Sequence, residues 1–146
     1  MILPDVNVLV IAHRSDQDHH EAMRAWLEAE VASERPFALS DLTVSGFLRI
    51  VTNPKIYRRP TPLGAAIEVV NGLIEHPTCV PVGPGARHWP IMREVLRGAD
   101  ARGNLVTDAH LAAIAIEHGA TIATRDRGFA RFTGLNWFDP LAEPRG

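Results

Sequence analysis

Short apolar runs alternate along the chain with longer segments whose apolar residues recur at helical spacing. The runs Ile2-Leu3 and Phe37-Ala38-Leu39 are typical of short buried strands. Between them, Met23, Trp26 and Leu27 mark one apolar face of a helix. Strands separated by helices favour a parallel sheet with helices on both of its faces. The pattern therefore predicts an α/β fold.

Capping and breaking residues predict where these elements begin and end. Asp18, with Glu21 three residues later, predicts one helix start, and Ser40 and Thr107 predict two others. The clearest loop covers residues 53–62 and contains three prolines. We expect strands over residues 2–3, 37–39, 78–82, 121–123 and 136–138, and helices over residues 6–13, 18–31, 41–53, 63–75, 87–96, 107–118 and 125–131.

Composition adds limits on the class of protein. A chain of 146 residues, 46% of them hydrophobic, has the size and composition of one globular domain, residues 1–146. Its net charge of -2 predicts no overall attraction to polyanions, so any such contact needs a local basic patch. The single cysteine, Cys79, excludes an internal disulfide. Without a membrane-length apolar run or a signal peptide, we expect a cytoplasmic protein that does not bind membranes.

Carboxylates follow the ends of several predicted strands. Asp5, Asp41 and Asp126 come after the first, second and fourth strands, and Asp108 lies in the first turn of a helix. Ligands of parallel sheets bind beyond the carboxyl ends of the strands, where these acids are expected to meet. Oxygen-only ligands suit Mg²⁺ or Mn²⁺, and a metal held in this way can activate water against a phosphodiester.

Helix capping is the alternative explanation of each acid. It is strongest for Asp41, which directly follows Ser40, and weakest for Asp5, because a cap does not account for Asn7. A zinc site is less favoured, since the histidines lack a Cys partner or an H-E-x-x-H arrangement. His110, two residues after Asp108, is expected to lie near the site and contact a phosphate.

Four segments in this order resemble one known family. They are PDVNVLV near the start, SGFLRIVTNP at 45–54, TDAHLAAIAIEHGATIATRDRGF at 107–129, and GLNWFDPL close to the end. They are similar to the PIN-domain toxins of VapBC toxin–antitoxin modules. The resemblance implies a three-layer α/β/α sandwich with a central parallel sheet. It also implies an endoribonuclease dependent on Mg²⁺ or Mn²⁺, a homodimer, a VapB-type antitoxin partner, and structured RNA (tRNA or rRNA) as the substrate.

The resemblance also assigns roles to single residues. Asp5, Asp108 and Asp126 match the catalytic acids of the family. Asp5 and Asp108 are the expected metal ligands, and Asp126 is expected either to bind the metal as well or to hold a metal-bound water. Asn7 and Thr124 match the polar residues that hold those acids in place. Thr107, which precedes Asp108, is grouped with them as a supporting residue.

Two positions depart from the family pattern. The family often has a glutamate where this chain has Gly46, and a further acid where it has Gly128. Asp41, about one helical turn before Gly46, is the candidate substitute for the first of these acids. Fewer acids favour one bound metal over two and are consistent with weak activity.

Basic residues supply the contacts that an RNA backbone requires. The candidates are Arg49 and the cluster Lys55, Arg58 and Arg59 in the proline-rich loop. Tyr57 within that loop is a candidate to stack on an unpaired base. A solvated surface loop is the alternative explanation of the same residues.

Two other functions compete with a ribonuclease. A haloacid-dehalogenase-like phosphatase needs an acid two residues after its nucleophile, and Asn7 cannot act as an acid or base. The second alternative is an RNA- or partner-binding module of the same fold with weak or no turnover. Metal-dependent cleavage of RNA separates this module from an active ribonuclease.

Overall fold

A computed structural model describes residues 1–142 of the chain, which form a five-stranded sheet in the order β3-β2-β1-β4-β5. All neighbouring strands are parallel, with Ile2 of β1 between Phe37 of β2 and Thr121 of β4. The strands are β1 (Ile2–Pro4), β2 (Phe37–Ser40), β3 (Cys79–Val82), β4 (Thr121–Ala123) and β5 (Trp137–Phe138).

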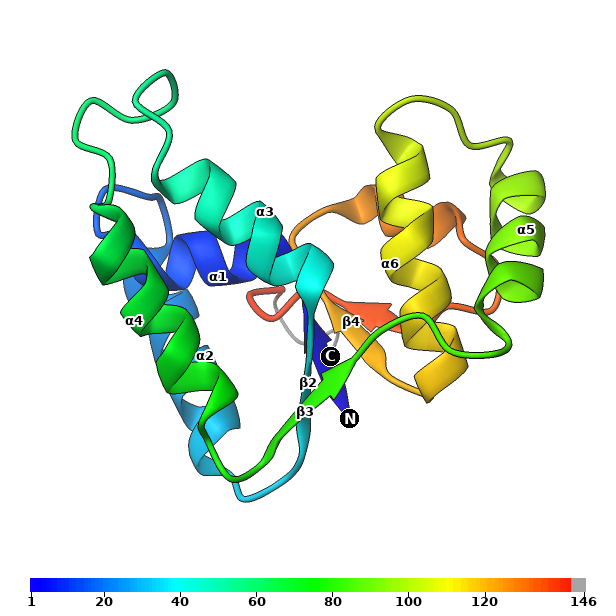
Figure 1. Ribbon diagram of the computed structural model, residues 1–146, viewed down its shortest axis with the longest axis horizontal. Helices are drawn as coiled ribbons and strands as arrows, with labels where there is room; N and C mark the ends of the chain where they lie inside the picture. Colours follow the sequence, from blue (N-terminus) through cyan, green and yellow to red (C-terminus); the bar gives the residue numbers. More distant parts are fainter. Residues whose placement is uncertain (143–146) are drawn as a thin grey trace.

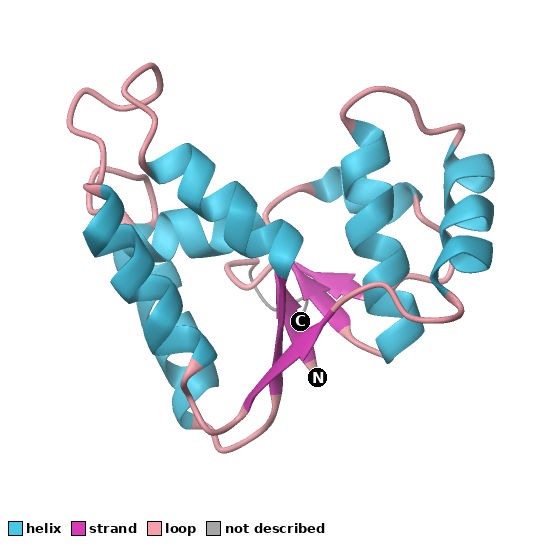
Figure 2. Ribbon diagram, in the orientation of Figure 1, coloured by secondary structure: helices cyan, strands magenta, loops and turns pink. Residues whose placement is uncertain are grey.

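Helices cover both sides of this sheet (Figures 1 and 2). One group packs with Leu39 of β2, and α6 packs with Leu3 and Ile122 on the opposite side. This arrangement confirms the α/β/α sandwich with a central parallel sheet. The first group is α1 (Val6–His13), α2 (His20–Ala32), α3 (Asp41–Val51) and α4 (Leu63–Ile74), and the second is α5 (His88–Ala99) and α6 (Leu105–His118), with a short 3₁₀ helix, η1, at Arg127–Arg131.

Several element boundaries agree with the capping signals. The Ser40 hydroxyl accepts a hydrogen bond of 3.1 Å from the amide of Leu42 and so caps α3. Gly119 ends α6 with a φ of 65°, a left-handed conformation that glycine adopts without strain. The first helix spans Val6–His13 as predicted, and the loop after α3 lies where the prolines place it.

The predicted start of the second helix is wrong. This helix begins at His20, and Asp18 does not cap it, because His19 stands at the N-cap in a left-handed conformation with a φ of 66°. A turn precedes this position, in which the Gln17 amide donates to the Arg14 carbonyl at 3.1 Å. The chain is therefore still turning at Asp18, where the capping box predicted a helix.

Other boundaries also differ from the prediction: α5 ends at Ala99 and not at Leu96, and α3 ends at Val51. Helix α6 begins at Leu105, before Thr107, because Leu105 packs against the core between α5 and α6 and extends the helix by two residues. The helix predicted at 125–131 is shortened to η1, since the Asp126 carboxylate accepts a hydrogen bond of 2.8 Å from Gly128 N and caps it there.

Within residues 1–142, no helix has the length and apolar composition needed to cross a membrane. The organisation of residues 1–146 as one domain stays a prediction, and residues 143–146 lie outside the described part of the chain.

Candidate active site

Asp5 stands at the junction between β1 and α1. Its amide donates to the Ala123 carbonyl at 2.9 Å, so the strand pairing between β1 and β4 extends up to this residue. Its backbone is extended, and its Oδ1 atom accepts from the amide of Val6 at 2.7 Å, which caps α1. Capping therefore explains one oxygen of the carboxylate and leaves the second for other contacts.

Thr124 and Asn7 hold that second oxygen. Asp5 Oδ2 accepts from the Thr124 hydroxyl at 2.8 Å and from Asn7 Nδ2 at 3.1 Å. Asn7 Nδ2 also donates to Thr124 Oγ1 at 3.0 Å, and Asn7 Oδ1 accepts from the amide of Arg125 at 3.0 Å. The fully buried Thr124 hydroxyl also accepts from Asp126 N at 3.0 Å, so its one donor and both of its acceptor positions are used. Asn7 and Thr124 thus contact Asp5 directly, and their role in orienting it for catalysis stays a prediction.

Asp108 lies in the same pocket as Asp5. This pocket has a volume of about 390 Å³ and is enclosed by residues of α1, α3 and α6. Thr107 and Arg49 lie at its wall, as does Gln17 from the turn before α2. Residues from distant parts of the chain thus meet beyond the carboxyl ends of the strands, where parallel sheets bind ligands.

Burial and neighbouring carboxylates disfavour the charged forms of Asp5 and Asp108. The pKa of Asp108 is raised to about 6, chiefly by burial and also by the charges of Asp5 and Asp126, while Arg131 opposes the rise. Burial also raises the pKa of Asp5 against the hydrogen bonds from Thr124 and Val6. A cation between these acids would relieve their repulsion, which makes the pocket a candidate metal centre.

Asp126 and Asp41 lie differently from the other two acids. Asp126 is exposed beside the pocket and acts electrostatically on both Asp5 and Asp108. Asp41 is also exposed, but it occupies the first turn of α3 and is not part of the pocket wall. Its position fits the helix-capping explanation, and the structure does not bring it together with Asp5 and Asp108.

The two glycines at positions where the resemblance implies acids, Gly46 and Gly128, lie at close packing contacts. A Cβ atom at Gly46 would lie 2.6 Å from Val6 Cγ2, so α3 approaches α1 closely at this point. A Cβ atom at Gly128 would lie 2.9 Å from Asp126 Oδ1. Neither position can accept a larger side chain unless its neighbour shifts. The close packing around Gly46 and Gly128 therefore disfavours an acidic side chain at either position.

The candidate RNA-binding residues fall into two places. Arg49 lines the acidic pocket, whereas Lys55, Arg58 and Arg59 are exposed on the loop between α3 and α4. The expectation for Tyr57 is wrong, because its side chain is only 8% exposed and packs in the core of α1, α3 and α4. A buried ring cannot stack on a base.

Some residues near the site carried no recognisable signal in the sequence. Gln17 reaches the pocket only because the turn before α2 folds back towards α1, and no motif marks it. The expectation for His110 is wrong, because it does not line the pocket and its ring lies against that of His88, with 4.9 Å between the centroids.

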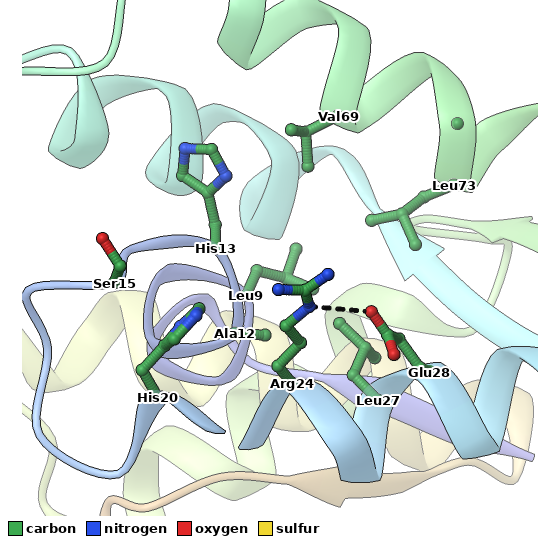
Figure 3. Close-up of a pocket in the computed structure, with 11 residues that line it drawn as sticks. Leu9, Ala12, His13, Ser15, His20, Arg24, Leu27, Glu28, Val69 and Leu73 are labelled. Atoms are coloured by element: carbon green, nitrogen blue, oxygen red, sulfur yellow. Dashed lines mark hydrogen bonds and ion pairs between the residues drawn. The ribbon is translucent and has the colours of Figure 1, made fainter. Parts of the chain in front are cut away.

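A second pocket, which we call the α1–α2–α4 groove, is lined by neither Asp5 nor Asp108. Figure 3 shows the residues of its wall. The groove has a volume of about 410 Å³. Apolar side chains form much of its wall, and an ion pair of 2.9 Å joins Arg24 and Glu28 of α2 beside them. The apolar residues are Leu9, Ala12, Leu27, Val69 and Leu73.

These features define an α/β/α protein with an acidic pocket at the carboxyl edge of its parallel sheet. The profile of the PIN domain family matches residues 2–135. The chain is also 43% identical over 141 residues to ribonuclease VapC43 of Mycobacterium tuberculosis, an alignment that covers 97% of this chain and 96% of the relative. The chain therefore belongs to the PIN domain family and, within it, to the VapC ribonucleases.

Solved structures share the fold at low sequence identity. The VapBC2 complex of Rickettsia felis, bound to a DNA fragment from its promoter, has a matching chain with a TM-score of 0.69 and 17% identity, covering 95% of this chain and 98% of that one. VapC20 of Mycobacterium tuberculosis, described as a toxin that cleaves the sarcin-ricin loop, matches with a TM-score of 0.66 and 14% identity, covering 93% and 99%.

Proposed function

We propose that this chain is the toxin of a type II toxin–antitoxin module. It would act as an Mg²⁺-dependent endoribonuclease that inhibits translation by cleaving structured RNA, either tRNA or rRNA. The observation that carries this proposal is the pocket in which Asp5 and Asp108 meet, where burial and the charge of Asp5 raise the pKa of Asp108. Membership of the VapC ribonucleases supports the choice of RNA as the substrate.

The donor set of the pocket fits a hard divalent cation. Asp5 and Asp108 contribute carboxylate oxygens, and the neighbouring polar groups of Asn7, Thr107 and Thr124 add no sulfur or imidazole ligand. Within residues 1–142, no three His, Cys, Asp or Glu side chains are grouped to hold an ion by themselves. Mg²⁺ is commonly bound through one or two carboxylates together with substrate phosphates, so two acids are sufficient, and Mn²⁺ suits the same ligands.

The residues of the pocket then have separate tasks. Asp5 and Asp108 would hold the cation, which when bound supplies Lewis-acid polarisation of the phosphate and lowers the pKa of the attacking water. Arg49, in the same pocket wall, would bind a phosphate oxygen of the RNA. Asp126 uses its Oδ1 atom to accept from Gly128 N, so we assign Oδ2 to hold the attacking water.

The alternative is a binding module of the same fold with weak or no turnover. The glycines at positions 46 and 128 favour it, because the pocket then contains fewer acids than the family pattern implies. Purified protein incubated with total RNA, with Mg²⁺ or with EDTA, distinguishes the two functions. Cleavage that requires Mg²⁺ supports the ribonuclease, whereas binding without cleavage supports the module.

The basic loop between α3 and α4 is expected to contribute to RNA binding. Changing Lys55, Arg58 and Arg59 together to glutamine is expected to weaken RNA binding and to reduce its salt dependence. Each phosphate contact to single-stranded RNA contributes about 0.7 to the slope of log K against log salt, so three lost contacts lower the slope by about 2. Filter binding or fluorescence anisotropy over a range of salt concentrations measures this slope.

The matched control removes the same charge elsewhere. Arg35, Arg93 and Arg97 are exposed and already paired with glutamates, so changing all three to glutamine should leave the slope unchanged. An equal loss of slope in both triple variants would show that net charge matters and that the loop is not an RNA contact.

We further propose a VapB-type antitoxin as the partner, bound in the α1–α2–α4 groove. An apolar groove between helices suits an amphipathic segment of a partner. Gly72 lies at the groove, and a Cβ atom there would meet nothing within 4 Å. Gly72→Arg is therefore expected to keep α4 folded, to leave RNA cleavage unchanged, and to weaken antitoxin binding by at least about tenfold, equivalent to about 1.4 kcal/mol.

Gly64 provides the control for this variant. It lies in the same helix with equally open surroundings but outside the groove, so Gly64→Arg should bind the antitoxin normally. Calorimetry with the purified antitoxin measures both affinities, and equal affinities would exclude the groove as the antitoxin site.

Light scattering of the toxin alone tests the proposed homodimer, which has twice the 16.0 kDa mass of one chain. A cytoplasmic location stays a prediction.

A further inference from the structure

Arg14 is a buried arginine just after the end of α1. Its side chain is only 8% exposed, although arginine is among the residues most often found at protein surfaces. Nε and Nη2 donate to the two oxygens of Asp16 at 2.9 and 2.6 Å, a bidentate pair. This pairing keeps the pKa of the Asp16 carboxyl below its usual range. Arg14 is therefore held in one orientation by its own turn.

The other side-chain contacts of Arg14 reach the loop between α3 and α4. Nη1 donates to the Thr61 hydroxyl at 3.1 Å, and Nη2 donates to the Arg59 carbonyl at 3.0 Å. The guanidinium also lies 3.7 Å from the centre of the Tyr57 ring, in cation–π contact. One side chain thus binds three separate points of a loop that lies far from it in the sequence. We call this set of contacts the Arg14 clamp.

The clamped loop contains the candidate RNA-binding cations. Lys55, Arg58 and Arg59 are exposed, and within residues 1–142 none of them takes part in an ion pair. The buried Tyr57 lies among them and anchors the loop in the core. The clamp therefore holds the backbone on which uncompensated positive charges are displayed.

The loop is also connected to the acidic pocket. Gln17 Nε2 donates to the Tyr57 hydroxyl at 2.9 Å, and Gln17 lines the pocket with Asp5 and Asp108. The backbone N–H of Gln17 donates to the backbone carbonyl of Arg14 at 3.1 Å. The clamp and the pocket wall therefore share one turn, so the position of the loop is set relative to the acids.

We propose that Arg14 is a positioning residue for substrate binding. By clamping residues 57–61, it holds Lys55, Arg58 and Arg59 where they can contact the phosphates of an RNA whose scissile bond lies in the acidic pocket. Arg14 itself, buried and paired, does not contact RNA. This inference rests on the proposed ribonuclease function.

The first measurement does not depend on RNA. Trypsin cleaves after lysine and arginine, and Lys55 and Arg58 lie in the clamped loop. Limited proteolysis of Arg14→Met should cut the loop at least about tenfold faster than in the wild type, because a released loop reaches cleavable conformations more often. Asp16→Asn, which keeps Arg14 but loses the bidentate pair, should give a smaller effect in the same direction. Arg35→Met is the control for the loss of one arginine and should match the wild type.

The second measurement separates binding from chemistry. With Arg14→Met, KM for RNA should rise about tenfold while kcat at saturating RNA stays within about twofold, and the salt slope of binding should fall by at least about 0.7. Arg14→Lys keeps the charge without the planar fork and should restore only part of KM. In the variant that also lacks Lys55, Arg58 and Arg59, Arg14→Met should have no additional effect on KM.

These outcomes distinguish the two levels of the proposal. A faster-cut loop with unchanged KM and salt slope would overturn the inference, as would additive effects of Arg14→Met and the triple variant. If the wild type neither binds nor cleaves RNA, the proposed function itself fails, whatever the proteolysis shows. Variants that unfold are recognised by circular dichroism, and Asp16→Asn, which changes an exposed side chain, then provides the test.

Discussion

Asp5→Asn is expected to reduce the rate of RNA cleavage about a thousandfold. The proposed cation supplies several kcal/mol of charge stabilisation in the transition state, and about 4 kcal/mol corresponds to a factor of about a thousand. The variant should fold, because an asparagine oxygen can still accept from Val6 N or from the Thr124 hydroxyl. Mapping of RNA 5′ ends after induction in cells, together with cleavage by purified protein, measures the loss.

Asp41→Asn is the matched control for this variant. Asp41 also follows a strand and begins a helix, but it is exposed and lies outside the pocket. Its replacement should change cleavage by less than about threefold, which corresponds to the small contribution of a charge at a helix N-terminus. A large loss in Asp41→Asn would show that this acid replaces the one missing at Gly46. Persistent cleavage in Asp5→Asn, or in EDTA, would contradict the metal-centred scheme and favour the binding-module alternative.

Mg²⁺ affinity and metal-free stability are expected to respond to pH in opposite directions. Asp108 has a pKa of about 6 in the folded chain, compared with an ordinary value of 3.8. Mg²⁺ needs the ionised carboxylate, so its affinity should fall by about tenfold for each pH unit below 6. Without metal, the folded state binds protons more readily than the unfolded state between these two pKa values, so acidification from pH 7 to 4 removes a destabilising charge.

A comparison with Asp108→Asn isolates this effect. His13 and His110 have lowered pKa values, chiefly because of burial, so their protonation destabilises the fold in acid and would mask the gain in the wild type. In EDTA at pH 7, Asp108→Asn should be more stable by about 1 kcal/mol, a value reduced for the solvent screening of a partly exposed group. This difference should shrink as the pH falls through 6. Urea unfolding at several pH values measures this difference. A difference that stays constant with pH would show that the pKa of Asp108 is not raised in the folded chain.

The sequence predicted the course of the chain because its signals are local. Alternation of apolar runs with helical periodicity marked the strands and most of the helices, and Ser40 and Gly119 marked helix ends correctly. The capping box at Asp18 failed for a reason outside that helix. The turn that contains Gln17 and His19 changes the chain direction just before the helix begins. The same turn contains Asp16, which holds the Arg14 side chain in place.

The sequence by itself determined the order of strands and helices along the chain, the residue types at the strand ends, and the family. Asp5, Asn7, Asp108 and Thr124 could be named in advance, because parallel strands direct their carboxyl ends to one edge and the motifs mark these positions. A pattern along the chain, however, contains no distances between segments.

Only the tertiary structure decided which side chains meet. Asp41 is exposed outside the pocket, whereas Tyr57 is buried in the core, where its ring cannot reach RNA. Packing of α3 against α1 left no space for a side chain at Gly46, and Arg14 gained its partners only when the loop after α3 returned to it. These outcomes depend on contacts between residues far apart in the sequence, and such contacts exist only after the sheet has brought its helices together.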